Sequence, residues 1–174
     1  MDLKLIEPTI EWDSGIQAFK AEMLQADSSM DGCGRLRSLA TTQEWLDDIA
    51  LYKSEATCPT GFVPMTQWIA VRESDNKVVG MIQFRHYLNE FLEKYGGNIG
   101  YSICPSERNK GYGTEQLALC LAKIKANGTA RVLISCLESN EASRKIITGN
   151  GGVYENTVVW QERNAHLERY WVQL

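Results

Sequence analysis

Two glycines and two basic side chains stand together directly before an apolar run, in the segment 108–114, which reads RNKGYGT. Gly111 and Gly113 allow positive φ and let a ligand approach the backbone without a Cβ in the way. The free amides of a helix start, with Arg108 and Lys110 beside them, would bind an anion. We therefore expect a phosphorylated ligand at this turn, although an ordinary solvated turn would use the same residue types.

Two known phosphate-binding motifs fit this turn poorly. A P-loop needs Gly-Lys followed by Ser or Thr, and the sequence contains no such string. A dinucleotide-binding fingerprint needs a third glycine where Gln116 stands, although Glu138 after the next apolar run resembles the ribose-binding acid of that motif. An NAD-dependent enzyme therefore stays an alternative, which NAD binding would support.

The bulk composition predicts one globular domain spanning residues 1–174. Hydrophobic residues make up 44% of the chain, and the net charge of −4 argues against a nucleic-acid partner. The five cysteines include no CxxC pair, so we expect neither a zinc or other metal site nor a disulfide framework. Neither a secretory signal nor a long apolar stretch is found in the sequence, which predicts a cytoplasmic protein without a membrane segment.

Apolar periodicity then indicates the elements that must position the turn. Spacings of three and four predict helices, alternating or continuous β-branched runs predict strands, and Asn140 is expected to cap the last helix. The predicted strands are 3–9, 66–73, 77–86, 98–105, 130–138, 153–161 and 166–174. The predicted helices are 11–27, 41–56 with Thr41 or Thr42 as its cap, a single turn within 87–97, the helix after the glycine turn, and 141–148. This order predicts a mixed α/β fold, with helices flanking one mostly antiparallel sheet.

The segment RNKGYG resembles the Arg/Gln-x-x-Gly-x-Gly/Ala signature of the GNAT superfamily of acetyl-CoA-dependent N-acetyltransferases. The strand before it is similar to the fourth strand of that family. Asn140 and Ser143 are similar to the Asn-x-x-Ser pattern that follows the fifth strand. The resemblance covers residues 65–174, which it identifies as an acetyl-CoA-binding core, and implies a sheet splayed between strands 4 and 5. Residues 1–64 match only in having a strand and two helices, which in this family shape the acceptor pocket.

The resemblance implies that acetyl-CoA is the co-substrate and assigns the residues that would hold it. The amides of the glycine turn would bind the pyrophosphate, and the backbone near Tyr101 would bond the pantetheine and reach the thioester oxygen. Asn140 would contact the pantetheine arm, cap its helix, or do both. The implied acetyl-CoA-binding residues are Ser102, Ile103, Arg108, Asn109, Lys110, Gly111, Tyr112, Gly113, Thr114, Asn140 and Ser143.

One departure from the family concerns proton transfer. The tyrosine that often protonates the leaving thiolate, four residues after the Ser of Asn-x-x-Ser, is replaced here by Ile147. A thiol has a pKa of about 8.5, so its thiolate can leave without a full proton transfer. The substitution nevertheless supports an alternative hypothesis, in which the fold is a non-catalytic acyl-CoA-binding module.

An active enzyme would also need a base, because an amine with a pKa near 10.4 is almost fully protonated at pH 7. We expect the catalytic residues to be drawn from His86, Glu90 and Tyr101. The segments 27–40, 58–65 and 86–97 would shape the acceptor site by analogy with the family. The acceptor is then a small-molecule or peptide amine, and the sequence leaves its identity and the formation of a homodimer open.

Overall fold

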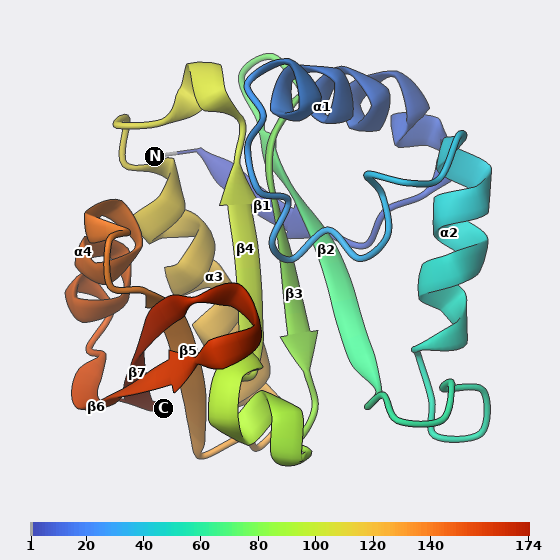
Figure 1. Ribbon diagram of the computed structural model, residues 1–174. Coiled ribbons are helices and arrows are strands. Elements are labelled where there is room, and N and C mark those ends of the chain that lie inside the picture. Colours follow the sequence, from blue (N-terminus) through green and yellow to red (C-terminus); the bar gives the residue numbers. More distant parts are fainter. Residues whose placement is uncertain (1) are drawn as a thin grey trace.

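The computed structural model describes residues 2–174, and its mixed α/β fold is the one that the sequence predicts (Figure 1). The strands are β1 (Leu3–Ile6), β2 (Met65–Arg72), β3 (Lys77–Arg85), β4 (Ile99–Ile103), β5 (Arg131–Leu137), β6 (Val153–Trp160) and β7 (Ala165–Gln173). The α-helices are α1 (Asp13–Gln25), α2 (Thr42–Leu51), α3 (Tyr112–Ala126) and α4 (Glu141–Gly149). The short helical turns are η1 (Ile10–Trp12), η2 (Leu92–Gly96, a π-helical turn), η3 (Pro105–Glu107) and η4 (Gln161–Arg163).

The strands within residues 2–174 form two antiparallel sheets. One has the order β1-β2-β3-β4 and the other the order β5-β7-β6. The predicted splay between strands 4 and 5 therefore goes further than a local opening, because β4 and β5 share no ladder among the described residues. The two strands are the edge strands of their respective sheets and lie next to each other (Figure 1), and the stretch over which they do not pair is the gap between β4 and β5.

Helices cover both faces of the four-stranded sheet. Alternate residues of β2 point to opposite faces because the side-chain period of a strand is two. Ile69 packs with α1 and α2, including the fully buried Trp45, in one apolar cluster. Trp68 packs instead with α3, where Leu117 is fully buried, in a second cluster that also takes in residues of β5 and β7. The start of α3 is thereby fixed against both sheets.

The first two helices are shorter than their apolar patterns predict. The predicted helix 11–27 becomes η1 followed by α1, which ends before Asp27 at a φ of 45°. Thr41 caps α2 through a capping box with Glu44, whose amide donates to Thr41 Oγ1 over 3.2 Å. The helix ends at Leu51, and the carbonyl of Tyr52 accepts from the Met65 amide over 2.8 Å. That bond returns the intervening loop to the sheet and leaves space beside α2.

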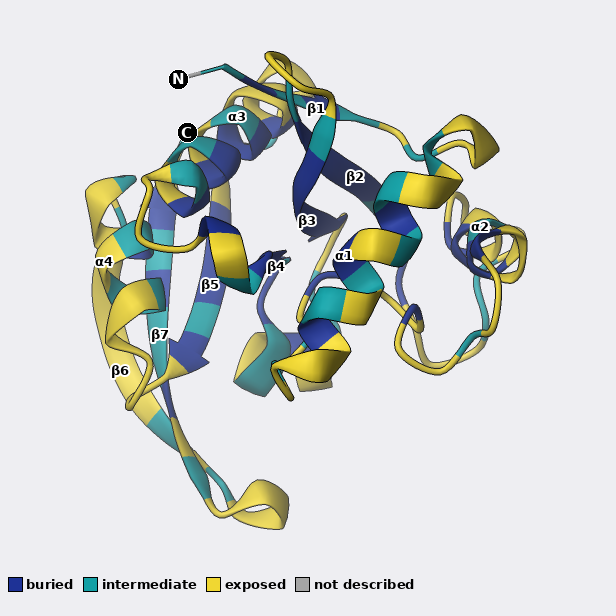
Figure 2. Ribbon diagram, turned by 90° about the horizontal axis from the view of Figure 1, so that it is seen from above, coloured by how far each residue is buried: buried dark blue, intermediate teal, exposed yellow. Residues whose placement is uncertain are grey.

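The β6–β7 hairpin forms the exposed side of the smaller sheet. Figure 2 shows β6 as mostly exposed, in contrast to the buried strands β2, β3 and β5. At the hairpin tip, the Trp160 ring stacks on Tyr95 of η2 with 5.1 Å between ring centroids. The hairpin thus reaches across to the segment that precedes β4.

None of the helices within residues 2–174 is both long and apolar enough to cross a membrane. In the same residues, no group of three or more histidine, cysteine or acidic side chains is arranged to hold a metal ion.

Candidate active site

The gap between β4 and β5 begins at Asn98. The Asn98 amide donates to the Leu133 carbonyl over 2.7 Å, and the Asn98 side-chain oxygen accepts from the Leu133 amide over 2.8 Å. Beyond this double contact, each strand pairs only with its own sheet among the described residues. The two strands are therefore hydrogen-bonded to each other at the start of β4 and not toward its end, which is called the open end of the gap.

The backbone of β4 presents free groups to this gap. The Asn98 carbonyl accepts from the Arg85 amide, and the Cys104 amide donates to the Val79 carbonyl, so even-numbered residues of β4 turn toward β3. The amides of Ile99, Tyr101 and Ile103 and the carbonyls of Ile99 and Tyr101 consequently point away from β3, toward β5. The Ile103 carbonyl, on the same side, accepts from Arg108 Nε. Such a row can bond an extended ligand as though it were an added strand.

Ser102 is turned away from this row. Its backbone faces β3, and its hydroxyl donates to the Asp31 carbonyl over 2.6 Å on the other face of the sheet. Of the two β4 residues predicted to bind acetyl-CoA, only Ile103 therefore turns its backbone toward the gap. The contact of Ser102 holds the loop 27–40 against β4.

The glycine turn lies at the open end of the gap and starts α3. Gly111 is the N-cap residue with a φ of 86°, and Asn109 also has a positive φ of 61°. The Glu115 amide donates to the Gly111 carbonyl over 3.2 Å, which leaves the three preceding amides of the helix start as donors for a ligand. The turn thus starts a helix at Gly111, and the binding of an anion to its amides stays a prediction.

The two glycines of the turn serve different purposes, which the sequence does not separate. Gly111 has positive φ, whereas Gly113 does not. A Cβ on Gly113 would lie 2.5 Å from Ile146 Cδ1, so this glycine lets α3 approach α4 closely. Only Gly111 is required for the backbone conformation of the turn.

The basic side chains of the turn have protein partners. Arg108 donates through Nε to the Ile103 carbonyl over 3.1 Å and through Nη2 to Ser28 Oγ over 2.5 Å. Lys110 Nζ lies 3.0 Å from Glu107 Oε2. Anion binding at this turn would therefore depend first on backbone amides.

Glu107 is the centre of a charge cluster under the turn. Its side chain is 5% exposed and lies 2.9 Å from Arg72 Nη1 and 2.7 Å from Lys77 Nζ, in addition to Lys110. Burial would raise the pKa of this carboxyl, but hydrogen bonds from the three cations outweigh it and hold the pKa at about 2. Arg72 Nη1 also donates to the Tyr112 hydroxyl over 3.1 Å, which ties the first residue of α3 to the cluster.

Across the gap, Asn140 and Ser143 begin α4. The Ser143 amide donates to Asn140 Oδ1 over 3.0 Å, so Asn140 caps the helix. Ser143 Oγ lies 2.7 Å from the hydroxyl of Tyr101, which therefore spans from β4 to α4. Burial raises the pKa of Tyr101 well above its usual range, and the hydrogen bond with Ser143 only partly offsets this. The phenol therefore stays protonated at neutral pH.

Ile147 is fully buried in the core below α4. A Cβ on Gly152 would lie 2.5 Å from Ile147 Cγ2, so the side chain is closely surrounded. The position that the family often gives to a tyrosine is thus part of the apolar core in this chain.

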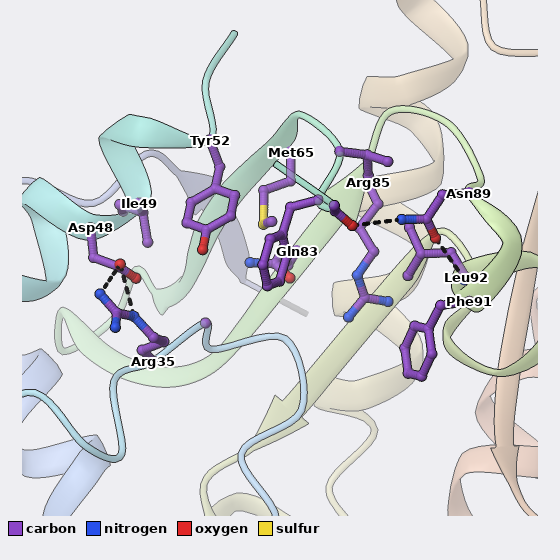
Figure 3. A pocket seen from close by; sticks show the side chains of 14 residues that line it. Arg35, Asp48, Ile49, Tyr52, Met65, Gln83, Arg85, Asn89, Phe91 and Leu92 are labelled. Carbon is purple, nitrogen blue, oxygen red and sulfur yellow. Dashed lines mark hydrogen bonds and ion pairs between the residues drawn. The ribbon is translucent and has the colours of Figure 1, made fainter. Parts of the chain in front are cut away.

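A pocket of about 510 Å³ opens beside α2, on the face of the sheet that carries α1 and α2 (Figure 3). It is bounded by α2, by the end of β3 and by the three segments predicted to shape an acceptor site, which are 27–40, 58–65 and 86–97. Apolar walls come from Ile49, Tyr52, Phe62, Val63, Met65 and Phe91. Polar groups come from Arg35, Asp48, Gln83, Arg85 and Asn89.

Two predicted base candidates lie differently with respect to this pocket. His86 follows Arg85, and its ring lies 5.5 Å from Phe84 and 2.9 Å from Thr66 Oγ1. Because side chains alternate along β3, His86 is on the opposite face from the pocket-lining Arg85. Desolvation also lowers the pKa of His86. Glu90 is exposed between Asn89 and Phe91, which both line the pocket.

Asp48, Gln83 and Arg85 line the pocket but were not predicted as site residues. Asp48 stands between Trp45 and Ile49 on the buried face of α2, where an acidic side chain is unusual. Gln83 and Arg85 occupy alternate positions of an otherwise apolar strand. Polar residues in such buried patterns were the signal in the sequence that could have located this pocket.

The comparisons with known proteins agree with this geometry. The acetyltransferase (GNAT) domain family matches residues 3–153. A crystal structure of the acetyltransferase that modifies the N-terminal serine of ribosomal protein L7/L12 from Salmonella typhimurium has a TM-score of 0.70 and 17% identity, covering 100% of this chain and 96% of that one. The microcin C7 self-immunity acetyltransferase in complex with acetyl-CoA and AMP has a TM-score of 0.71 and 13% identity, covering 99% and 93%. A spermidine N-acetyltransferase chimera from Vibrio cholerae has a TM-score of 0.69 and 9% identity, covering 99% and 96%. Among curated proteins, no sequence matches this chain.

Proposed function

Because the chain belongs to the acetyltransferase (GNAT) family of acetyl-CoA-dependent N-acetyltransferases, we propose that it transfers the acetyl group to a primary amine by direct attack in a ternary complex. Acetyl-CoA enters from the gap between β4 and β5, and the amine enters from the pocket beside α2. The reaction then takes place near the start of β4, where the gap and the pocket approach each other.

The observation that carries this proposal is the alignment of two sets of backbone donors along one gap. The outward amides of Tyr101 and Ile103 line its β4 side, and the amides at the start of α3 lie at its open end. The pyrophosphate of acetyl-CoA binds the amides of residues 108–114, and the pantetheine follows β4 toward Asn98. Asn140 and Ser143 border the opposite wall, while Arg108 and Lys110 shape the turn.

The chemistry needs an oxyanion donor, a proton donor and a base. The amine nitrogen forms a bond to the thioester carbon, and the carbon–sulfur bond breaks as the thiolate leaves. An outward amide of β4 stabilises the oxyanion of the intermediate. The Tyr101 hydroxyl, held by Ser143, gives its proton to the thiolate. Glu90, at the rim of the pocket, accepts the proton of the amine through water.

The acceptor is a small-molecule or peptide amine. The similar structures include an enzyme that modifies the N-terminal serine of a ribosomal protein and a spermidine N-acetyltransferase, so the fold suits both peptide and small amines. We also propose a cytoplasmic location, because the five cysteines are free thiols and suit a reducing compartment.

The test begins with a thermal shift of the purified protein in acetyl-CoA, beside NAD and ATP. A ligand present at about 100 times its Kd should stabilise the fold by roughly 2.7 kcal/mol and raise the Tm by several degrees. The second step measures thiol release from acetyl-CoA with a panel of amines. Stabilisation by acetyl-CoA together with amine-dependent thiol release supports the proposal, and stabilisation by NAD alone would contradict it.

A second candidate function is a non-catalytic acyl-CoA-binding module, which the buried Ile147 favours. In that case acetyl-CoA stabilises the fold, but no amine accelerates thiol release. The Tyr101–Ser143 pair argues for catalysis, because it supplies a hydroxyl from β4 where α4 supplies no tyrosine.

A further inference from the structure

Arg85 places a guanidinium in the wall of the pocket beside α2. Its Nη1 donates to the carbonyls of Gly96 and Gly97 over 2.9 Å and 3.1 Å. These two bonds hold the group in place, and among residues 2–174 neither Nε nor Nη2 donates a hydrogen bond to another residue. Figure 3 shows the guanidinium directed into the same space as the hydroxyl of Tyr52. The free edge of Arg85 is therefore available to a ligand.

The other charges of the pocket do not neutralise Arg85. Arg35 donates through Nε and Nη2 to Asp48 Oδ1 over 2.9 Å and 2.5 Å, so these two groups cancel each other. Within residues 2–174, no carboxylate forms an ion pair with Arg85. Burial lowers the pKa of this guanidinium, yet an arginine side chain stays protonated in proteins. Asp31 attracts this guanidinium without forming an ion pair with it, so the buried positive charge is only partly compensated. An anionic ligand group would relieve the remaining cost of burying it.

The position of this charge next to β4 limits where the anion can be in the acceptor. Arg85 Nη2 lies 3.2 Å from the position that a Cβ on Gly100 would occupy. The neighbouring residue, Tyr101, turns its backbone toward the gap in which the thioester would lie. An anionic group bound by Arg85 would therefore lie beside β4, close to an amine that reacts there, which favours an acceptor whose amine and anion are near each other. A planar guanidinium fits the two oxygens of a carboxylate.

We propose that Arg85 binds the carboxylate of a free α-amino acid, which is the acceptor, and that the apolar side chain of this amino acid occupies the pocket. This inference rests on the proposed function. An α-amino acid has its amine one carbon away from its carboxylate, so both groups can lie beside β4. Its side chain would pack against Ile49, Phe62 and Met65, in a volume suited to a small ligand. A polyamine offers Arg85 only positive charge, and a peptide N-terminus offers it a neutral amide.

The experiment compares free leucine, methionine and phenylalanine with the corresponding amino acid amides, beside spermidine and a serine-initiated peptide. Thiol release is measured as kcat/KM for each acceptor in wild type, Arg85→Gln, Arg85→Lys and Arg131→Gln. We expect wild type to prefer each acid over its amide by at least about tenfold, which is the usual effect of one charged hydrogen-bonded pair. Arg85→Gln should reduce that ratio to near one, and Arg85→Lys should keep part of it.

The acid-to-amide ratio separates recognition from structural damage. Arg85→Gln also loses the bonds to Gly96 and Gly97, and that loss would lower the rates with acid and amide equally. Arg131→Gln is the control, because it removes an arginine that packs on Trp171 outside the pocket, and it should leave the ratio unchanged. If Arg85→Gln does not fold, the acid-to-amide ratios of wild type and Arg85→Lys still test the assignment. Ratios near one in wild type would contradict it.

Two further outcomes keep this inference distinct from the proposed function. If wild type releases thiol with amides, spermidine or the peptide as readily as with the free acids, the acceptor assignment is wrong while the acetyltransferase stands. If acetyl-CoA neither stabilises the protein nor is cleaved with any acceptor, the proposed function fails and the assignment of Arg85 falls with it.

Discussion

The turn at the start of α3 and the pocket beside α2 present polar groups in opposite ways. At the turn, charged side chains are bonded to the protein, and backbone amides face the space for a ligand. In the pocket, side chains such as Arg85 line the space for a ligand. Backbone recognition tolerates many sequences and suits a ligand shared across a family, whereas side-chain recognition can change with the acceptor.

The largest effect should come from removing the charge that organises the turn. Glu107→Gln leaves Arg72, Lys77 and Lys110 without their common partner, which should cost about 3 kcal/mol of unfolding free energy. Because the folded pKa is about 2 against an ordinary value of 4.5, this stabilisation is complete above pH 4.5 and lost as the pH falls toward 2. Urea unfolding between pH 7 and pH 2 measures it. Equal acid sensitivity in the variant and wild type would contradict the cluster's role.

The next effect concerns Tyr101 on β4. Tyr101→Phe removes only the hydroxyl that bonds Ser143, and it should lower kcat about 100-fold while leaving the Kd for acetyl-CoA nearly unchanged. Tyr154→Phe is the control, since its hydroxyl bonds Thr157 at the surface over 2.8 Å. An unchanged kcat in Tyr101→Phe would remove the phenol from the mechanism.

A smaller effect tests whether backbone conformation alone sets coenzyme affinity. Gly111→Ala and Gly128→Ala each force alanine to a φ of 86°, at opposite ends of α3, and each should cost about 1–2 kcal/mol of stability. Only Gly111→Ala should weaken acetyl-CoA binding, by about tenfold or more, because it moves the amides of the turn. Isothermal titration with acetyl-CoA gives the comparison. Equal loss in both variants would show a general effect of stability.

The smallest effect separates the two base candidates. Glu90→Gln should lower kcat about tenfold at pH 7, whereas His86→Ala should change it less than about twofold, because the imidazole lies on the other face of the sheet from the pocket. Steady-state kinetics with the best acceptor measures both. A larger loss in His86→Ala would mean that the acceptor reaches β3 from the other side.

The turn could be predicted from the sequence because its signals are local. Two glycines, two basic residues and a helix start lie within one short segment, and neither distant contacts nor loop packing are needed to identify them. The N-cap role of Asn140 is local in the same way. The fold class followed from the order of periodic segments, which is also readable along the chain.

The pocket could not be predicted in the same way because its walls come from segments far apart in the chain. Strand alternation already places Arg85 and His86 on opposite faces, since a shift of one residue moves a side chain across the sheet. It does not say which face carries the acceptor site. The face is determined by the position of the loop before β2, which the hydrogen bond between Met65 and Tyr52 holds against α2.

The contact between Asn98 and Leu133 also has a consequence for how the molecule opens with time. One backbone bond and one bond to the Asn98 side chain join the two sheets at this residue pair. Side-chain contacts, such as Tyr101 with Ser143 and packing on α3, make the remaining connections. Segments joined in this way tend to open as separate cooperative units, which deuterium exchange of the backbone amides resolves. We expect β5–β7 and β1–β4 to exchange as two groups in the free protein. A molecule filling the space between them would make them exchange as one.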